Sequence, residues 1–368
     1  MKKSGFIAFA AIAVFMLLGA TWASALDPIP QESGFSGFVR PGVGYLKYKS
    51  NMVASIQGFD LSKEKNDDRN DSPDSETTAL VTLPFNLAYT LASTRTQLYF
   101  GTDPTDLMRF DLSQQIGVKQ GIGNFGILQG GFLFSGTPAK VWKDPYLEGE
   151  DRDDTKRKST GARLVWDRIF GSFFQVQYTY RKIDIDSEKS GESLNFLTSS
   201  ERNLLERDSD RQSVDLSYRF HFAKSHILAP AFIYTHDDRD GKAMKNDAYD
   251  FQLTYVFLER GNPFSFTGNA YLGQADYDKR NPIYGKTQED DRYGIQGTVY
   301  YENPWGWSLF GSRPMNFFVG GAYAKTDANI DFYDQEAIMG SAVSYTHLRA
   351  HETVTLIAYA VFCLTMGG

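Results

Sequence analysis

Residues 213–222 read SVDLSYRFHF and residues 248–257 read AYDFQLTYVF, and these two stretches decide the fold class. In both, apolar and polar side chains alternate along the chain. The apolar positions are Val214, Leu216, Tyr218, Phe220 and Phe222 in the first stretch, and Tyr249, Phe251, Leu253, Tyr255 and Phe257 in the second. Because successive side chains of a β-strand point to opposite faces, this period of two predicts strands with one apolar and one polar face.

The same alternation recurs along the chain, often over ten residues or more. It predicts strands over residues 35–49, 78–90, 94–101, 107–119, 125–135, 160–167, 172–184, 212–222, 227–236, 248–259, 264–275, 292–302, 315–325 and 332–342. Strands of a soluble β-sandwich, the alternative fold, usually run only about five or six residues. Long strands whose apolar face ends in Tyr, Phe or Trp are typical of a transmembrane antiparallel up-and-down β-barrel. We expect about 14 strands, within a range of about 12 to 16.

Composition and connection lengths favour the same all-β architecture. Aromatic residues make up 15% of the chain, yet no apolar run reaches the roughly 20 residues of a membrane helix. Such a chain crosses a bilayer only as a barrel, in which the backbone groups pair between strands. Short connections (91–93, 120–124, 168–171, 223–226, 260–263) alternate with long charged ones (50–77, 136–159, 185–211, 277–291). Two connections are exceptions: 102–106 is short for an outer loop, and 303–314 is long for a periplasmic turn. This alternation is expected of periplasmic turns and outer loops.

The two ends of the chain are expected to lie outside the barrel domain, which spans residues 26–342. Residues 1–25 have a charged start, an apolar centre and the small residues Ala23, Ser24 and Ala25, so they predict a signal peptide cleaved near Ala25. Residues 343–368 contain VSYTHLRAHET and IAYAVFCL, which resemble a translated sequencing-library adapter. We therefore expect a non-native tail that cuts off the last strand.

Charge and cysteine content exclude several classes of function. The formal net charge is −7, which argues against a general nucleic-acid binder. The single cysteine, Cys363, lies in the expected tail, so neither a disulfide scaffold nor a cysteine metal site is expected. With the expected signal peptide, these features predict the outer membrane of a Gram-negative bacterium.

Three further segments carry a family resemblance. They are IPQESGFSGFVRPGVGYLKYKSNM (29–52), NLAYTLASTRTQLYFG (86–101) and ARLVWDRIFGSFFQVQYTYRKIDID (162–186). They resemble an uncharacterised family of Gram-negative exported proteins known only as a domain of unknown function. The resemblance implies an exported barrel and supplies no catalytic motif, ligand or mechanism.

The polar face of the expected strands holds the candidate site residues. If the apolar faces look outward, charged side chains of both signs line the lumen. These are Arg109, Asp111, Arg163, Asp167, Arg181, Asp215, Arg219 and Asp250. Opposed rows of Arg and Asp can select polar solutes by their field. The same side chains can also pair across the lumen and close it.

Other candidate sites give weaker patterns. His236-Asp237-Asp238 suggests the Asp/His pairing of barrel proteases but has no second acidic pair opposite, so a solvated acidic rim is favoured. The acidic stretches 67–71 and 148–154 are oxygen-rich but irregular, and solvated loops are favoured over a calcium site. Thr198 to Glu201 reads as a capping box and predicts a short helix that either narrows the mouth or packs on a neighbouring loop.

The sequence thus predicts a passive channel or porin for small polar solutes. The alternative is a structural or surface-interaction barrel without an open pore, and an outer-membrane hydrolase is the third hypothesis. We expect no enzymatic activity, no cofactor, no metal and no nucleic-acid partner. Expected partners are outer-membrane lipids and lipopolysaccharide, and the oligomeric state is left open.

Overall fold

The computed structural model describes residues 29–56, 58–102, 112–303, 305–306, 308–309 and 313–347. They form an all-β structure with a large antiparallel sheet of 20 strands and a separate two-stranded sheet. The large sheet contains β1 (Gly34–Val39), β2 (Gly42–Lys49), β3 (Val53–Ile56), β4 (Phe59–Asp60), β5 (Ser75–Thr82), β6 (Phe85–Leu91), β7 (Thr96–Thr102), β8 (Leu112–Ile122), β9 (Gly126–Thr137), β10 (Ala139–Trp142), β11 (Asp154–Asp167), β12 (Phe174–Ile185), β13 (Ser209–Tyr218), β14 (Phe220–Phe222), β15 (His226–Arg239), β16 (Asn246–Leu258), β17 (Phe264–Arg280), β18 (Thr287–Tyr301), β21 (Asn316–Ala328) and β22 (Gln335–His347). The small sheet contains β19 (Ser308–Leu309) and β20 (Arg313–Pro314). The helical elements are α3 (Ser199–Arg202) and the 3-10 helices η1 (Ala92–Thr94), η2 (Gly123–Phe125), η3 (Ile169–Gly171), η4 (Asn203–Leu205) and η5 (Asp331–Tyr333).

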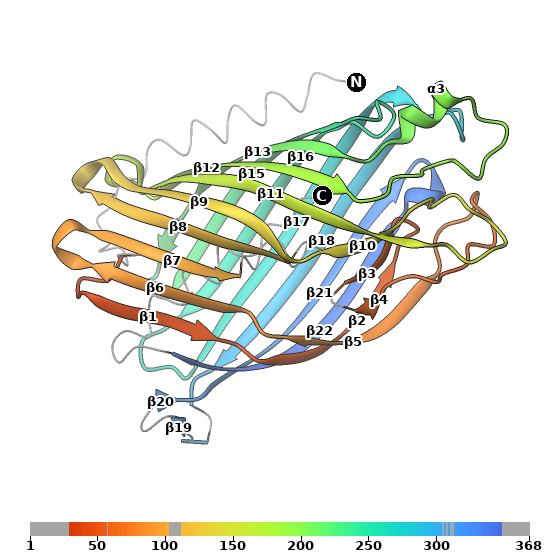
Figure 1. Cartoon of the computed structure of the whole chain (residues 1–368). Coiled ribbons are helices and arrows are strands. Elements are labelled where there is room, and N and C mark those ends of the chain that lie inside the picture. The colour runs from red at the N-terminus through yellow and green to blue at the C-terminus, as the bar shows by residue number, and fades with distance from the viewer. Residues whose placement is uncertain are drawn as a thin grey trace.

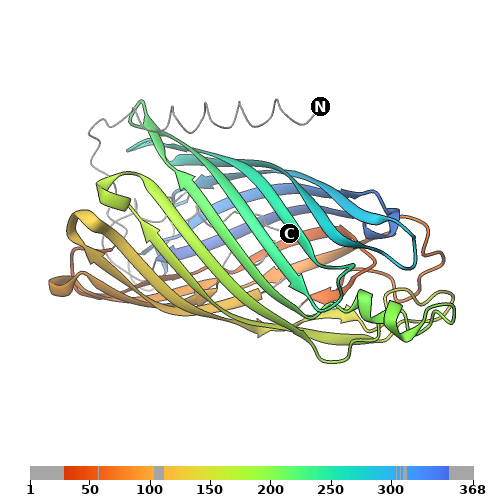
Figure 2. The same ribbon diagram turned by 90° about the horizontal axis from the view of Figure 1, so that it is seen from above.

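The large sheet is a meander whose ends meet. From β5 to β18, strands pair mainly with their neighbours in the chain, and they lie side by side and strongly tilted (Figures 1 and 2). The last strand, β22, pairs with β21 on one side and with β2 on the other, from the pair Gly42–Val343 to the pair Lys49–Glu336. β1 also pairs with β22 and, on its other edge, with β6.

The expected count of about 14 strands is wrong, because the large sheet has 20. Three of the expected strands are each split into two shorter ones, two of them beside a proline, Pro41 or Pro84. Proline has no backbone N–H to give to a strand ladder, so the pairing breaks there. The third break lies at Arg219. Two stretches expected as loops add the remaining strands: 50–77 contains β3 and β4, and 136–159 contains β10, which follows Pro138.

The sheet is apolar on its outer face and polar on its inner face. Leu164, Leu272, Ile295 and Val319 are each at least 60% exposed, whereas many Ser, Thr, Gln and Asn side chains that alternate with them are buried. On β16, for example, Tyr249 and Leu253 are exposed, while Asp250, Gln252 and Thr254 are at most 2% exposed. A soluble protein has the reverse arrangement.

The two ends of the sheet differ, as the connection lengths predicted. At one end most turns are tight, and three of them contain η1, η2 and η3; the connection between β18 and β21, which carries β19 and β20, is the longer exception. At the other end lie the long connections, including the one that carries α3 (Figure 1). Several strands run further into this end than expected: β11 begins at Asp154, β17 ends at Arg280 and β18 begins at Thr287. Their added residues are charged and do not alternate with apolar ones, so periodicity alone does not mark them as strand.

The expected terminal segments fall largely outside the described part of the chain. This holds for the signal peptide with its cleavage near Ala25 and for residues 348–368. β22 continues past residue 342 to His347, and the foreign origin of residues 343–368 stays a prediction. No helix in the described ranges is long and apolar enough to cross a membrane.

Candidate functional site: the polar inner face and the loop cluster

Ion pairs join charged side chains on the inner face, within one strand and between strands. Arg219, just after β13, binds Asp167 at the end of β11, so these two expected residues form a pair. Arg211 on β13 and Arg239 on β15 both contact Asp237, with N···O distances of 2.7 and 2.9 Å. Because each carboxylate lies beside a guanidinium, these charges are compensated within the wall.

Asp250 is the most deeply buried of the expected site residues, at 1% exposure. Its carboxylate accepts a hydrogen bond from Nη2 of Arg292 on β18 at 2.6 Å. The strand between them, β17, carries Gly273, where an added Cβ would lie 1.9 Å from Oδ1 of Asp250. The missing side chain of Gly273 therefore lets the ion pair form across an intervening strand.

Arg163, Arg181 and Asp215 lie on the inner face as expected and are buried. Nε of Arg163 donates to the Thr179 hydroxyl at 3.1 Å. Arg181 donates to the hydroxyls of Ser159 and Ser113, each at 3.2 Å. Asp215 accepts hydrogen bonds from Nε2 of Gln177 at 2.7 Å and from the Ser213 hydroxyl at 2.8 Å. The two remaining expected residues, Arg109 and Asp111, lie outside the described residues.

The residues expected at the site did not include Arg292, Asp237 and Tyr99, which also lie on the inner face. Arg292 and Asp237 were detectable, since each belongs to an alternating stretch, Arg292 next to Tyr293 and Asp237 next to His236. Tyr99 was not detectable, because an aromatic residue on a barrel strand is expected to face outward. It is 7% exposed and its hydroxyl accepts from Nε2 of Gln115 at 2.7 Å and from Nε2 of Gln129 at 3.1 Å.

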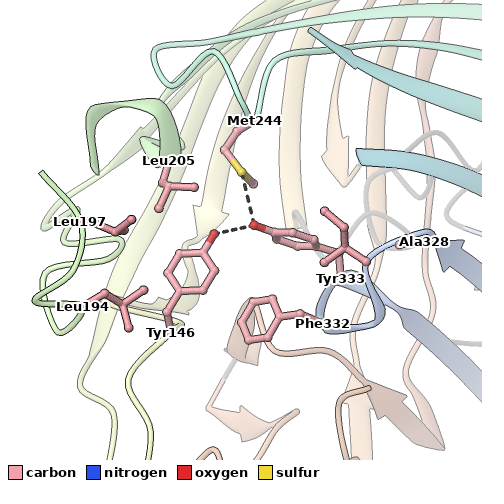
Figure 3. Close-up of a cluster of buried hydrophobic side chains, with 9 residues drawn as sticks. Tyr146, Leu194, Leu197, Leu205, Met244, Ala328, Phe332 and Tyr333 are labelled. Atoms are coloured by element: carbon pink, nitrogen blue, oxygen red, sulfur yellow. Dashed lines mark hydrogen bonds between the residues drawn. The ribbon is translucent and has the colours of Figure 1, made fainter. Parts of the chain in front are cut away.

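The long connections meet in a compact hydrophobic cluster at their end of the sheet (Figure 3). We call it the loop cluster. Its buried members are Tyr146, Leu194, Leu197, Leu205, Met244, Ala328, Ile330, Phe332 and Tyr333, and Met52, Ile283 and Tyr284 pack against it. The connections concerned follow β2, β10, β12, β15, β17 and β21, strands spread around the large sheet. The loops therefore meet across this end rather than standing apart as solvated loops.

Tyrosine hydroxyls join the parts of the loop cluster. The hydroxyls of Tyr146 and Tyr333 are 2.7 Å apart (Figure 3). Nδ2 of Asn281 donates to the Tyr333 oxygen at 2.7 Å. The Tyr146 ring also stacks on Phe332, with centroids 5.1 Å apart. Burial raises the pKa of the Tyr333 hydroxyl to about 12 and that of Tyr146 well above its ordinary value. Both phenols are therefore neutral at physiological pH.

Buried charged side chains fix the loop backbones beneath this cluster. Arg152 donates to the carbonyl oxygens of Glu64, Asn51, Pro145 and Lys63, at 2.6 to 3.2 Å. Burial lowers the Arg152 pKa to about 10, which leaves it cationic at neutral pH. Arg207 pairs with Glu188 at 2.7 Å and donates to the carbonyl of Trp142. Each guanidinium thus links separate segments of the chain through their backbone carbonyl groups.

The expected short helix is confirmed. Thr198 and Glu201 form a reciprocal capping box at the start of α3, which continues into η4. Leu205 at the end of η4 is fully buried in the loop cluster. Of the two positions considered for this helix, the structure shows packing against neighbouring loops.

The side-chain arrangement gives no support to the hydrolase and metal hypotheses. His236 and Asp237 alternate on β15, and Nδ1 of His236 lies 2.7 Å from Asp247, which also accepts from the Tyr234 hydroxyl. Asp237 instead lies on the inner face beside its two arginines. Within the described ranges, no group of three His, Cys, Asp or Glu side chains could hold a metal ion.

Several solved structures match most of this chain at low sequence identity. OmpT of Vibrio cholerae, as a loop L8 deletion mutant, is 11% identical, with 85% of this chain and 99% of that chain covered and a TM-score of 0.39. A FadL homologue of Pseudomonas aeruginosa is 9% identical, with coverages of 85% and 89% and a TM-score of 0.40. OccK7 (OpdD) of the same organism is 9% identical, with coverages of 86% and 99% and a TM-score of 0.34. These likenesses do not extend to ligands or activity.

No curated protein matches the sequence. One protein family does: it is described as "Protein of unknown function (DUF2860)" and matches residues 34–345. The match takes in the segments 86–101 and 162–186 and most of 29–52, so it confirms the resemblance noted from them. The chain belongs to the DUF2860 family of proteins of unknown function.

Proposed function

We propose that this protein is an outer-membrane β-barrel that acts as a passive channel for small polar solutes. The main support for the proposal is the polarity of the sheet, whose outer face is apolar and whose inner face is polar. Leaving a Val, Leu or Ile side chain in water rather than burying it costs about 1.5–3 kcal/mol. A band of such side chains around a sheet is stable where lipid covers it.

The pairing of β22 with β2 and β1 supports a closed barrel. β22 pairs with the whole of β2 and with Phe38 and Val39 of β1, and a spanning sheet needs all its backbone groups paired. Barrels with more than about eight strands enclose a lumen wider than their own side chains fill. The inward Arg and Asp residues then set which polar solutes pass.

Lipid and lipopolysaccharide are the proposed neighbours of the outer face. Lys182–Asp184 and Lys325–Asp327 form ion pairs with N···O distances of 3.4 and 3.1 Å near the loop end of β12 and β21. Tyr180, beside Lys182, donates to Asp210 on β13 at 2.6 Å. Aromatic side chains followed by ion pairs are expected at the boundary between lipid chains and charged head groups.

The loop cluster favours a second candidate, a structural barrel without an open pore. Because loops from around the sheet meet in one buried core, they restrict access to the lumen from that end. In this case the charged loop surfaces would contact lipopolysaccharide or other cells, and the inner ion pairs would serve stability alone.

Single-channel recording in planar bilayers distinguishes the two candidates. The protein is folded into detergent micelles, checked for a heat-dependent mobility shift on gels, and added to the bilayer. The channel predicts discrete current steps whose size grows with salt concentration. Silence from folded, heat-modifiable protein would reject the channel and leave the structural barrel.

A further inference from the structure

One part of the inner face is polar but uncharged. It spans the adjacent strands β16, β17 and β18, on the side of the Asp250–Arg292 pair that faces the tight turns. We call it the neutral patch, and its members are Gln252, Thr254, Thr267, Asn269, Tyr271 and Gln296. The structure describes every inward position of β16, β17, β18 and β21, and none on this side of the pair is charged.

The strand register brings the members of the neutral patch together. Gln252 lies opposite Tyr271 and Thr254 lies opposite Asn269, which in turn lies opposite Gln296. Alanines occupy the neighbouring inward positions on both sides. Ala229 and Ala231 of β15 pair with Thr254 and Gln252, and Ala322 of β21 pairs with Gln296. Because an alanine side chain has no polar atom, neither flank supplies the patch with a side-chain hydrogen bond.

Hydrogen bonds inside the patch leave three oxygen atoms unused. Nε2 of Gln252 and Nδ2 of Asn269 both donate to the Thr254 hydroxyl oxygen, at 3.2 and 2.8 Å. Oε1 of Gln252, Oε1 of Gln296 and Oγ1 of Thr267 are buried and have no hydrogen-bond partner among the described residues. Gln252 and Thr267 are only 2% and 1% exposed. A buried acceptor without a donor is unfavourable, so these inward-facing oxygens favour a donor that comes from the lumen.

Tyr271 adds an aromatic ring and a further hydroxyl to the patch. It is partly exposed, whereas Gln252 beside it is buried. The residue opposite it on β18 is Gly294, which has no side chain to cover the ring. The structure records no hydrogen bond of the Tyr271 hydroxyl within the described part of the chain. The ring can pack against C–H groups of a solute while its hydroxyl forms a hydrogen bond.

We propose that the neutral patch is a binding site for uncharged, hydroxyl-rich solutes such as short oligosaccharides. The inference rests on the channel proposed above and deepens it, because it names the class of solute. A sugar hydroxyl both donates and accepts hydrogen bonds, as amide and hydroxyl side chains do. It would donate to the unused oxygens of Gln252 and Gln296. An ionic solute would lose water at this site without meeting an opposite charge.

Block of the single-channel current by sugars tests the proposal. The probes are maltotriose and trigalacturonate, which have the same number of sugar rings but differ in that trigalacturonate carries carboxylates. Maltotriose should block the wild-type current saturably, and trigalacturonate should block it much more weakly. The variant Gln252→Leu/Gln296→Leu removes both amides at similar side-chain size. It should bind maltotriose about tenfold more weakly, as expected for the loss of two neutral hydrogen bonds.

Two single variants complete the test. The control is Gln274→Leu, which makes the same change at an exposed outward position of β17 and should keep the wild-type block. Tyr271→Phe breaks no hydrogen bond seen among the described residues, so it should fold as the wild type does. It should weaken the block by maltotriose about threefold. Equal block by both probes, or unchanged block in the double variant and in Tyr271→Phe, would overturn the sugar site while leaving the channel intact.

Calorimetry covers the case in which no current flows. Folded, heat-modifiable protein is titrated with maltotriose in micelles of lauryldimethylamine oxide, a detergent without a sugar head group. Binding to wild type and to Gln274→Leu that is weakened in Tyr271→Phe and in the double variant supports the site, even if the channel is rejected. Absence of maltotriose binding to the wild type would overturn the site whether or not the pore conducts.

Discussion

Replacing Leu205 with alanine should loosen the loop cluster and leave the sheet intact. Leu205 is fully buried there, among Leu194, Leu197 and Tyr146. Truncating a fully buried leucine costs about 2–5 kcal/mol, depending on how far the site collapses. The cluster lies at the loop end, apart from the strand ladders, so the loss should appear as local opening rather than global unfolding.

Limited trypsin digestion of the folded protein measures that opening. Lys189 lies in the same connection as Leu205, and its side chain is 48% exposed, so cleavage depends on how often the loop backbone detaches. A loss of about 3 kcal/mol corresponds to roughly a hundredfold more open form, and the cleavage rate should rise accordingly. The heat-dependent mobility shift of the sheet should persist.

Leu164→Ala serves as the matched control, because it makes the same change at a side chain that is 60% exposed on the outer face. Its cleavage rate should equal that of the wild type. Equal cleavage of Leu205→Ala and Leu164→Ala would refute the argument that the loops form a cooperative core. Loss of the mobility shift in Leu205→Ala would show instead that the cluster and the sheet unfold together.

Two further perturbations follow from the same contacts. Gly273→Ala places a Cβ against Asp250 and should separate it from Arg292, so the urea midpoint should fall by the equivalent of about 1–3 kcal/mol. Gly130→Ala, whose added Cβ would lie 3.6 Å from Leu164, is the control, and an equal effect in both variants would contradict the ion-pair account. Raising the pH should open the loop cluster, because Tyr333 has a pKa of about 12 when folded and an ordinary value of 10.0. The stability that the neutral Tyr333 phenol contributes to the loop cluster is complete below pH 10 and is lost as the pH rises toward about 12, so trypsin sensitivity and tyrosinate absorbance should increase together. A cleavage rate that stays constant while tyrosinate forms would contradict this.

The fold class and the inner positions could be read from the sequence because a strand alternates strictly between two faces. Tyr249 and Asp250, or Leu164 and Arg163, are assigned to opposite faces by their order alone, and the structure agrees. The number of strands could not be obtained this way. Pro41 and Pro84 interrupt ladders within otherwise continuous patterns, and the mostly charged residues 276–280 belong to β17 although they show no regular apolar–polar alternation.

The loop cluster could not be predicted, since its members are isolated apolar residues in charged connections. Tyr146 and Tyr333 share a hydrogen bond although 187 positions separate them. Tyr146 lies in a stretch expected as a loop. Tyr333 lies at the start of the expected strand 332–342, where the structure instead has η5, and β22 begins only at Gln335. The partners of the expected site residues are equally non-local: Asp250 binds an arginine two strands away only because Gly273 intervenes.

Site-specific quenching tests most directly the claim that the apolar outer face meets lipid and the polar inner face does not. Single cysteines in a Cys363→Ser background would carry a fluorophore, in protein folded into vesicles. Outward and inward positions come from the same strands, namely Leu164, Leu272 and Ile295 against Ser159, Thr267 and Thr298. We predict that brominated lipid chains quench the outward probes and spare the inward ones. Outward probes that are quenched by aqueous iodide and are unaffected by the brominated lipid would contradict the account.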